Sequence, residues 1–392
     1  MKIALVCPAS LPASQFGGIL FLTVNLAKKF SKMRHETTIF TTDLDYSNNL
    51  KTFNKNLPST EIISGFKINR SHCWFSIYLY FVSPGMYNRL LNYKPDIIHT
   101  VGLRSFQSFI AALVSKKSNI PLVVSDQGGL FTHPELKEAN LFKRILYRIQ
   151  IPIISMIVKQ SSRIIVGNEY EKEIFSRFNV DSKIKIVHNG IDLDLLKVDS
   201  ASFKEKYRVG GRYILFVGRF AKSKGIDILL NAIALIKNKL QMKNTKLVIM
   251  GIEQDFGKQM KNLIKKLELE NHILLIEKPE RSDVISAYKE CEFLVLPSRW
   301  ELSPLVPLEV FAFKKPAIGS NTHGIPYTIK HNENGLLTEP EDHKQLAEAI
   351  FDLLENEKKR ILFGEAGYNL VTNTCNSEEM ANKTLKIYQE II

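Results

Sequence analysis

Two series of short β-branched runs, each run separated from the next by a longer amphipathic stretch, follow one another along this chain of 392 residues. Runs with so few polar residues, alternating with helical patterns, are typical of parallel sheets that are covered by helices on both faces. The sequence therefore predicts an α/β chain with two successive doubly wound, Rossmann-like domains. The first series comprises Lys2–Cys7, Glu36–Thr42, Asp96–Val101, Leu122–Ser125, Arg163–Gly167 and Lys183–His188, and the second Tyr213–Gly218, Lys246–Met250, Ile273–Ile276, Phe293–Pro297 and Ala317–Gly319.

The break between the two series falls in Asp192–Arg212, a polar stretch that ends in two glycines before the next apolar run. We therefore predict an N-terminal domain over residues 1–195, a C-terminal domain over 196–375, and a final helix over 376–392 that packs back on the first domain. Open parallel sheets bind ligands at the carboxyl ends of their strands. We expect the two domains to face a cleft.

The net charge of +13 is unevenly distributed, because residues 1–195 carry 24 basic and 14 acidic side chains whereas the remainder carries 29 and 26. A basic first half indicates an anionic partner: nucleic acid, an acidic lipid surface or a phosphorylated ligand. A merely soluble basic surface is the alternative. No aromatic-basic recognition motif or helix-turn-helix is visible, so nucleic acid is not expected.

The four cysteines are scattered, so neither a disulfide framework nor a zinc site is indicated, and a reducing compartment fits best. No run reaches the roughly 18–20 apolar residues of a membrane-spanning helix. Met1–Val6 is interpreted as a strand and not as a signal peptide. A cytoplasmic protein is expected.

Two segments nevertheless suit the cytoplasmic face of an anionic membrane: the aromatic-rich Trp74–Phe81, and Phe142–Lys159, which mixes basic and apolar residues. The alternative for the second is a helix that packs on its own sheet.

Gly17 and Gly18 open a predicted helix that runs to about Lys32. Paired glycines at such a junction let a phosphate approach backbone N–H groups at the positive helix end. A plain turn is the alternative. The segment lacks the spacing of a dinucleotide fingerprint.

The strand over residues 213–217 is followed by Gly218, Arg219 and Lys224, just before a helix predicted over 225–238. Cations at the carboxyl end of a strand can hold a diphosphate. Solvated surface cations are the alternative interpretation.

The segment from Leu296 to Glu309 predicts a helix with Ser303 as N-cap and Pro304 as first residue, continuing through Phe311. Its start would direct the free N–H groups of Leu305 and Val306 to an anion. Glu301 precedes this helix and Glu309 lies inside it, and carboxylates accept hydrogen bonds from vicinal hydroxyls. A ligand that carries both phosphates and sugar hydroxyls would match these elements, whereas two purely structural glutamates are the alternative. The triplets Asp43–Asp45 and Asp192–Asp194 lack further carboxylates nearby in sequence, so no metal site is expected.

Taken in order, these motifs resemble those of the family 4 glycosyltransferases, a large group of retaining enzymes with the GT-B fold of two Rossmann-like domains. The resemblance covers nearly the whole chain. It rests on Gly17-Gly18, Pro95–His99, His188–Asp192, Phe216–Arg219 with Lys224-Gly225, and the pair of glutamates Glu301 and Glu309.

The resemblance implies a nucleotide-sugar donor, a glycan or lipid-linked acceptor, and no cofactor or metal. It implies that Arg219 and Lys224 neutralise the donor diphosphate, and that Glu309 binds the ribose and Glu301 the donor sugar. It also implies that amides near Leu305, Val306 and Gly18 hold phosphate. Retention is thought to proceed with the departing phosphate oxygen taking the acceptor proton, with charge stabilisation by cations and helix ends.

The chain departs from the family pattern at three places. Glu301-Leu302-Ser303-Pro304 replaces the usual Glu-Gly-Phe-Gly, and His323–Tyr327 replaces a common Gly-Gly and glutamate. The cleft histidine that often follows the strand over 122–125 is absent, which leaves Asp126, Gln127 and His133 as candidates for the donor-sugar contact. A sugar-nucleotide epimerase of the same architecture and a non-catalytic nucleotide-sugar binding module are the alternative functions.

Overall fold

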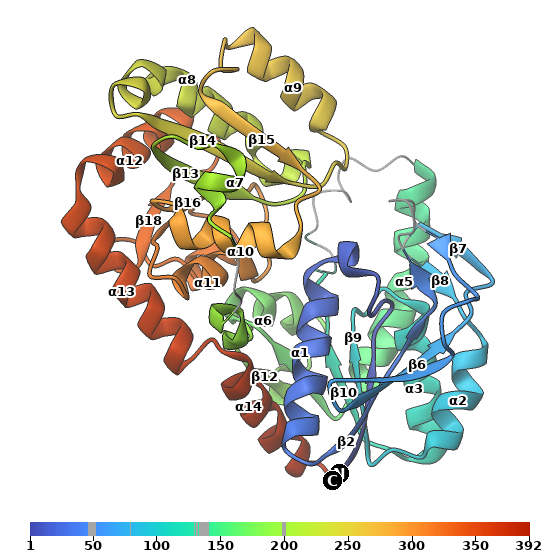
Figure 1. Cartoon of the computed structure of the whole chain (residues 1–392). Helices are drawn as coiled ribbons and strands as arrows, with labels where there is room; N and C mark the ends of the chain where they lie inside the picture. Colours follow the sequence, from blue (N-terminus) through green and yellow to red (C-terminus); the bar gives the residue numbers. More distant parts are fainter. Residues whose placement is uncertain (46–51, 79, 129, 131, 133–140, 198–200) are drawn as a thin grey trace. The chain divides into compact units, whose positions relative to one another are not determined.

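The computed structural model describes residues 1–45, 52–78, 80–128, 130, 132, 141–197 and 201–392. The chain forms two compact units. Unit 1 consists of Met1–Gly190 together with Ser377–Ile392, and unit 2 consists of Ile191–Asn376. The break lies within a few residues of the boundaries expected from the sequence, and the final helix belongs to the first unit. Each unit is an α/β fold built on a parallel sheet, as predicted (Figure 1).

The sheet of unit 1 has the order β12-β11-β10-β9-β1-β2-β6-β5. All neighbouring strands pair in parallel except β5 and β6, which form an antiparallel edge. Strands β1 and β9 are neighbours although β2 to β8 lie between them in sequence, so the order of winding reverses there. The strands are β1 (Lys2–Val6), β2 (Glu36–Thr42), β5 (Thr60–Ile63), β6 (Phe66–Ser71), β9 (Ile97–Val101), β10 (Leu122–Ser125), β11 (Arg163–Val166) and β12 (Ile184–Ile186).

Helices cover both faces of this sheet, and two small antiparallel pairs, β3-β4 and β7-β8, lie outside it. Helix α1 packs against α14, whereas α3 packs against α2 and α5. The helices are α1 (Gly18–Lys32), α2 (Gly85–Tyr93), α3 (Phe106–Ser118), α5 (Leu141–Gln160), α6 (Glu169–Ser176) and α14 (Ser377–Gln389), and the short strands are β3 (Leu44–Asp45), β4 (Thr52–Phe53), β7 (Phe75–Ile77) and β8 (Tyr80–Val82).

Buried hydrogen bonds hold the C-terminal helix α14 against the sheet of unit 1. His99 in β9 lies 2.6 Å from the Tyr388 hydroxyl through Nδ1 and 2.8 Å from Ser125 Oγ through Nε2. The Tyr388 ring also packs 5.8 Å from that of Phe30 in α1. Burial lowers the pKa of His99 to about 3, so the ring is neutral and serves as a hydrogen-bonding element of the core.

The sheet of unit 2 is entirely parallel, with the order β15-β14-β13-β16-β17-β18. Its winding reverses between β13 and β16. The strands are β13 (Arg212–Val217), β14 (Thr245–Gly251), β15 (Ile273–Glu277), β16 (Leu294–Leu296), β17 (Ala317–Ser320) and β18 (Gly335–Thr338), and the helices are α7 (Phe203–Tyr207), α8 (Ile226–Met242), α9 (Gly257–Lys266), α10 (Arg281–Glu290), α11 (Leu305–Phe311), α12 (His343–Glu355) and α13 (Glu357–Asn373).

Alternation along β13 explains why both faces of this sheet are covered. Ile214 and Phe216 point into one core with α8 and α12, whereas Tyr213 and Leu215 point into a second core with α10 and α11. All four side chains are fully buried. A strand that is apolar at every position fits only between two helical layers, which is why the sequence pattern predicts this architecture.

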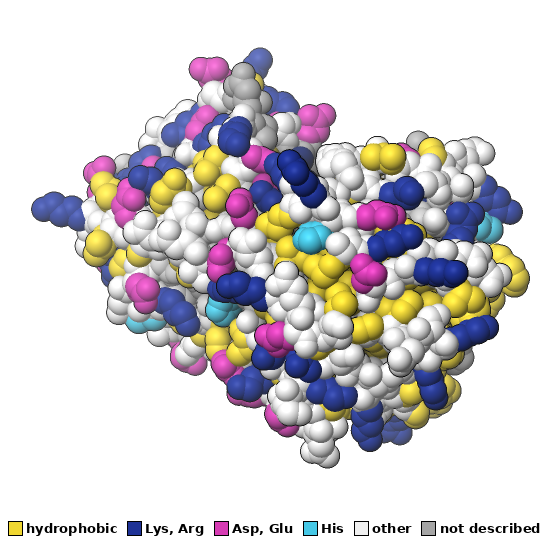
Figure 2. Space-filling model, turned by 90° about the horizontal axis from the view of Figure 1, so that it is seen from below, with side chains coloured by type: hydrophobic (Ala, Val, Ile, Leu, Met, Phe, Trp, Pro, Cys, Tyr) yellow, Lys and Arg dark blue, Asp and Glu magenta, His cyan; other side chains and the backbone are white. Residues whose placement is uncertain are grey.

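Within the described residues, no helix is both long enough and apolar enough to cross a bilayer. The excess positive charge is not gathered into one patch on the face seen from below, where Lys and Arg side chains are scattered with Asp and Glu among them (Figure 2). On this face, any binding role of the positive charge therefore belongs to particular helices or loops and not to one broad basic surface.

Candidate functional site

The candidate site of unit 2 lies where the winding of its sheet reverses. Strands β13 and β16 pair at Leu215 and Leu294, and both end at the same edge of the sheet. The loop that follows β13 runs from Gly218 to Gly225, and the loop that follows β16 begins at Pro297. Crevices at such a reversal, outside the carboxyl ends of the strands, are where open α/β sheets bind ligands.

The two loops are held together at Gly225 and Arg299. Gly225 has φ of 65°, and a Cβ there would lie 1.9 Å from the carbonyl oxygen of Pro297, so only glycine permits this approach. The backbone N–H of Arg299 donates to the Ser223 carbonyl at 2.8 Å, and its guanidinium donates to the Lys222 carbonyl at 2.7 Å. These contacts fix the cation-bearing loop against the glutamate-bearing loop.

Arg299 itself is anchored by two carboxylates that sequence reasoning missed. Its guanidinium makes a bidentate contact with Asp227 at 2.7 and 2.8 Å, and its Nε lies 2.6 Å from Glu341. Hydrogen bonds to these carboxylates raise the pKa of Arg299, so it stays charged. Arg299 lies in the segment singled out for its glutamates, but nothing in the local pattern identifies its distant partners.

Lys224 and Glu301 are brought together by this arrangement. The Lys224 ammonium lies 2.6 Å from Glu301 Oε1, and the fully buried Ser298 donates to the same oxygen at 3.0 Å. Both charged side chains are largely buried, with 17% and 12% exposure. Among the residues that the structure describes, Glu301 Oε2 has no hydrogen-bond partner. The pair therefore offers further ammonium donors and a carboxylate oxygen to a ligand.

Arg219 follows directly on β13 and Gly218, and its side chain is exposed. In the described ranges its guanidinium makes no ion pair. Gly218 donates its N–H to the Met250 carbonyl at 3.0 Å, which continues the pairing of β13 with β14 to the end of the strand. Arg219 thus lies on the same loop as Lys224, and its contact with a diphosphate stays a prediction.

Glu309, inside α11, is held by two residues of α10. Its carboxylate receives hydrogen bonds from the Arg281 guanidinium at 2.5 and 3.1 Å and from the Tyr288 hydroxyl at 2.8 Å. Burial, together with the Glu309 charge, raises the pKa of Tyr288 well above its ordinary value, so the hydroxyl remains a donor. The sequence did not reveal Arg281 and Tyr288. Arg281 does open a helix directly after a parallel strand, a position that could have drawn attention to it.

The start of α11 differs from the expectation. Pro304, with φ −68° and ψ 131°, is the N-cap in place of Ser303, and the helix begins at Leu305 and ends at Phe311. The extended ψ of Pro304 excludes it from the helix, so the predicted Ser303 cap is wrong by one residue. Because Pro307 has no N–H, Leu305 and Val306 supply the free donors of the first turn.

A third loop, which follows β17, contacts the segment that carries Glu301. Gly324 donates its N–H to the Glu301 carbonyl at 2.9 Å, and His323 Nδ1 lies 2.7 Å from Thr322 Oγ1. The unusual His323–Tyr327 stretch therefore contacts the backbone of the site. It places an imidazole where the resembled family commonly has a glycine pair.

In unit 1 the glycine pair stands where the sequence predicts it. Gly17 is the N-cap of α1 with φ of 101°, and the helix begins at Gly18 and ends at Lys32. No atom lies within 4 Å of the position that a Cβ of Gly17 would occupy. Glycine is therefore required here by backbone conformation and not by crowding.

The candidates for the donor-sugar contact have different surroundings. Asp126 is buried, and its carboxylate accepts backbone N–H groups of Leu103, Gly128 and Leu130 at 3.2, 3.1 and 2.9 Å. Gln127 exchanges two 3.1 Å hydrogen bonds with the Asn189 amide. His133 lies outside the described residues. The bonds of Asp126 hold the loop after β10, and a contact of these residues with the donor sugar stays a prediction.

Two further ionisable side chains lie near Asp126, the half-buried Arg104 and the buried Glu171. Arg104 packs its guanidinium 4.5 Å from the Tyr147 ring and donates to the Leu130 carbonyl. Glu171 accepts the Gly167 N–H at 3.1 Å, and burial raises its pKa to about 8, with the Asp126 charge adding to the shift. Glu171 is consequently protonated at neutral pH.

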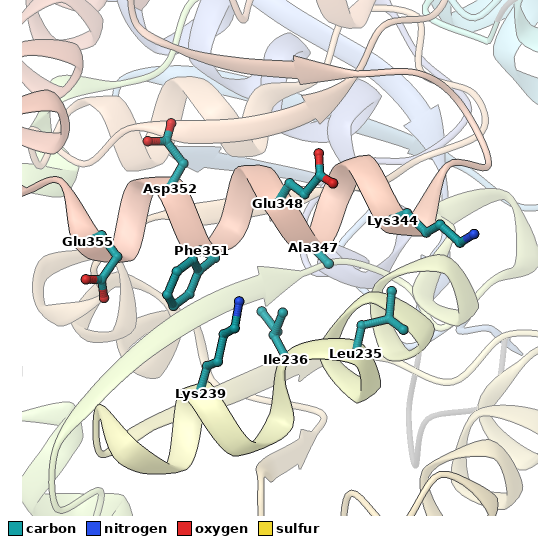
Figure 3. Close-up of a pocket in the computed structure, with 9 residues that line it drawn as sticks. All are labelled: Leu235, Ile236, Lys239, Lys344, Ala347, Glu348, Phe351, Asp352 and Glu355. Carbon is teal, nitrogen blue, oxygen red and sulfur yellow. The ribbon is translucent and has the colours of Figure 1, made fainter.

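A groove of about 600 Å³ on unit 2 lies away from this site (Figure 3). Helices α8 and α12 line it with Ile236 and Phe351, and two of its carboxylates, Asp352 and Glu355, are paired with lysines. None of the residues at the β13–β16 reversal lines it. Among the described residues there is also no group of three potential metal ligands.

Comparison with protein families identifies both halves of the chain. Residues 16–195 match the model described as Glycosyltransferase Family 4, and residues 198–370 match the model described as Glycosyl transferases group 1. A similar curated protein is an uncharacterised glycosyltransferase of Methanocaldococcus jannaschii, which is 29% identical over 287 residues, 73% of each chain.

Solved structures share the fold over the full length. Sucrose-phosphate synthase of Thermosynechococcus elongatus superposes with a TM-score of 0.77 at 18% identity, covering 100% of this chain and 99% of that one. HepE of Anabaena, in complex with UDP and glucose, gives 0.77 at 17% identity and complete coverage of both chains. These identities are low, so the likeness establishes the fold alone, which is the GT-B fold.

Proposed function

The chain belongs to the group 1 glycosyltransferases of family 4, and from this membership we propose that it moves a hexosyl group from a nucleoside-diphosphate sugar to an acceptor hydroxyl with retention of configuration. The single observation that carries the assignment of the donor site is the Lys224–Glu301 pair at the β13–β16 reversal. A cation and a carboxylate held 2.6 Å apart match a ligand that joins phosphates to sugar hydroxyls.

In the proposed reaction the bond between the sugar C1 and the diphosphate oxygen breaks, and its electron pair stays on the diphosphate. The acceptor hydroxyl oxygen forms the new bond to C1 on the same face, and its proton passes to the departing phosphate oxygen. Arg219 and Lys224 stabilise the charge that develops on the leaving group. Glu301 and Glu309 are therefore binding residues here and not the acid and nucleophile of a glycosidase.

Glu309 is the proposed ribose ligand. Arg281 and Tyr288 hold its carboxylate by three hydrogen bonds, so its orientation is set before the nucleotide arrives. Leu305 and Val306 supply N–H groups for phosphate, and Gly17 and Gly18 remain a predicted phosphate contact of unit 1. Because the chain supplies its own cations at the diphosphate, we propose that no metal or other cofactor is needed.

The acceptor is proposed to be a glycan or a lipid-linked saccharide, reached at the cytoplasmic side of a membrane. The excess of basic residues in 1–195 supports an anionic acceptor or surroundings. Two proteins of the same fold, HepE of Anabaena in complex with UDP-glucose and starch synthase IV of Arabidopsis thaliana bound to ADP and acarbose, favour uridine and adenosine donors as the first to be tried.

A panel of nucleotide sugars, incubated with the protein and a membrane extract, tests this function. We expect one donor to release its nucleoside diphosphate only when the acceptor extract is present. An epimerase would convert the donor without the extract, and a binding module would release nothing with any donor. Either result would overturn the proposal.

A further inference from the structure

In the hairpin β7-β8 of unit 1, strand β7 has an inverted polarity pattern. Phe75 and Ile77 on β7 are 54% and 42% exposed, whereas the serine between them is half-buried. Their cross-strand partners are Val82 and Tyr80, so the outer face of the hairpin is apolar on both strands. Phe81, on the inner face, is fully buried. A soluble hairpin normally buries its apolar face and exposes its polar one.

Two aromatic residues extend this outer face. Trp74, just before β7, is 69% exposed, and Tyr78, in the turn, is 46% exposed. Residues 74–82 contain no charged side chain. Contiguous exposed apolar surface of this kind marks a site of interaction, and Trp and Tyr are the residues enriched where an apolar phase meets water.

Helix α5 carries a second exposed apolar surface, combined with positive charge. Leu141, Ile145 and Ile149 follow one another at intervals of four residues and are 74%, 46% and 61% exposed. Such spacing places them on one side of the helix. Arg144 and Arg148, each adjacent in sequence to an isoleucine of this row, are exposed, and α5 contains no acidic residue. In the described part of the chain neither arginine makes an ion pair.

The hairpin and α5 each contact the chain at the start of α3. The Tyr80 ring of β8 lies 5.9 Å from that of Phe106, the first residue of α3, and Tyr147 of α5 lies 4.5 Å from the Arg104 guanidinium two residues earlier. Figure 1 shows α5 and the hairpin on the same side of unit 1. The aromatic hairpin and the basic-apolar helix are thus neighbours in one unit.

We propose that β7-β8 and α5 together form a docking face for an anionic lipid bilayer. Exposed aliphatic and aromatic side chains supply the apolar insertion, and Arg144 and Arg148 complement acidic headgroups. A protein partner of the usual kind would need acidic groups opposite the arginines, whereas a bilayer supplies negative charge and an apolar layer over the whole area. Docking of this face would bring the protein to its acceptor at a lipid surface. Only this consequence rests on the proposed function.

Flotation with phosphatidylglycerol–phosphatidylcholine vesicles tests the docking face without any enzyme activity, so its failure is distinct from that of the transferase. We expect binding to the acidic vesicles that falls as salt is raised, and little binding to vesicles of phosphatidylcholine alone. The change of Arg144 and Arg148 to Glu should lower the partition coefficient by at least about ten-fold. The matched control, Lys265→Glu with Lys266→Glu on α9, makes the same change in net charge and should bind as the unmodified protein does.

The chain has only two tryptophans, Trp74 and the largely buried Trp300, which makes the fluorescence readout specific. We expect a blue shift of the emission when acidic vesicles are added, and its loss in Trp74→Phe, which should still float. Binding by α5 alone would leave Trp74 in water and overturn the role of the hairpin. Absence of vesicle binding would overturn the membrane proposal. A dimer in solution that Trp74→Ser and Phe75→Ser convert to a monomer would also overturn it, because the face would then pair two copies of the chain.

Discussion

The Lys224 ammonium lies 2.6 Å from the Glu301 carboxylate, although 77 residues separate them in sequence. Both side chains are mostly shielded from water, so loss of one partner leaves the other charge poorly compensated. The pair joins the loops after β13 and β16, and in the proposed function it lies where the diphosphate and the sugar of the donor meet.

Nucleoside diphosphates provide the first test. UDP, GDP and ADP, assayed separately, should include one that raises the melting temperature, and Lys224→Ala or Glu309→Ala should abolish that rise because each removes a proposed ligand contact. Lys261→Ala is the matched control, since Lys261 forms a surface ion pair with Glu277 and should leave the rise unchanged. A shift that survives both site changes would show the site assignment to be wrong.

Tyr288→Phe should weaken nucleotide binding without unfolding the protein. The phenyl ring can remain in the same buried position, and only the 2.8 Å hydrogen bond to Glu309 is lost. One such bond to a charged group is worth about 1.5–3 kcal/mol, or roughly ten-fold or more in affinity. Titration calorimetry with the stabilising nucleotide measures it. Tyr207→Phe, which removes a bond to Asp283 instead, should bind normally, and equal weakening in both variants would contradict the positioning role.

Arg299→Ala should destabilise unit 2 and weaken donor binding together. The change removes the guanidinium contacts to Asp227, to Glu341 and to the Lys222 carbonyl, whereas the main-chain bond from the Arg299 N–H to the Ser223 carbonyl remains. We expect a loss of about 1–3 kcal/mol in the free energy of unfolding, measured by urea titration. Unchanged stability with normal nucleotide affinity would mean that Arg299 does not hold the loops.

The pH dependence of stability should change in Glu171→Gln. The folded-state pKa of Glu171 is raised to about 8, whereas an unfolded glutamate titrates near 4.3. The neutral form therefore contributes stability that is complete below about pH 4.3 and is progressively lost as the pH rises through about 8, since only the unfolded state releases its proton in this range. Urea unfolding between pH 5 and 8 should show the unmodified protein losing stability relative to the glutamine variant. Parallel curves would argue against the raised pKa.

Removal of divalent cations should leave the transferase activity in place. Arg219 and Lys224 carry the charge stabilisation in the proposed mechanism, so EDTA in excess should change the rate of nucleoside diphosphate release by less than about two-fold. The reaction is followed with the donor found in the nucleotide-sugar panel. Loss of activity that Mg²⁺ or Mn²⁺ restores would refute metal independence.

Local sequence patterns were sufficient for the fold and for part of the site. The helix that opens at Gly18 ends at Lys32, as its amphipathic pattern predicts, and β13 ends just before Gly218 and Arg219. The edge strands β5 and β18 were not predicted, and neither was β6, the neighbour of β5. Short strands with partly polar sequences, such as Thr60–Ile63, carry a weak alternation signal because they are covered on one side only.

Local patterns along the chain are enough to predict the two parallel-sheet units, since strands that are largely apolar on both faces fit between two layers of helices. They also predict that Arg219, Lys224 and Glu301 follow strand ends and that Glu309 lies inside the next helix. The three-dimensional packing makes β13 and β16 neighbours, and this joins Lys224 to Glu301 and brings Arg299 to Asp227. Periodicity specifies which face of a strand is buried but not which strand lies beside it, because that choice is made by packing between residues far apart in the chain.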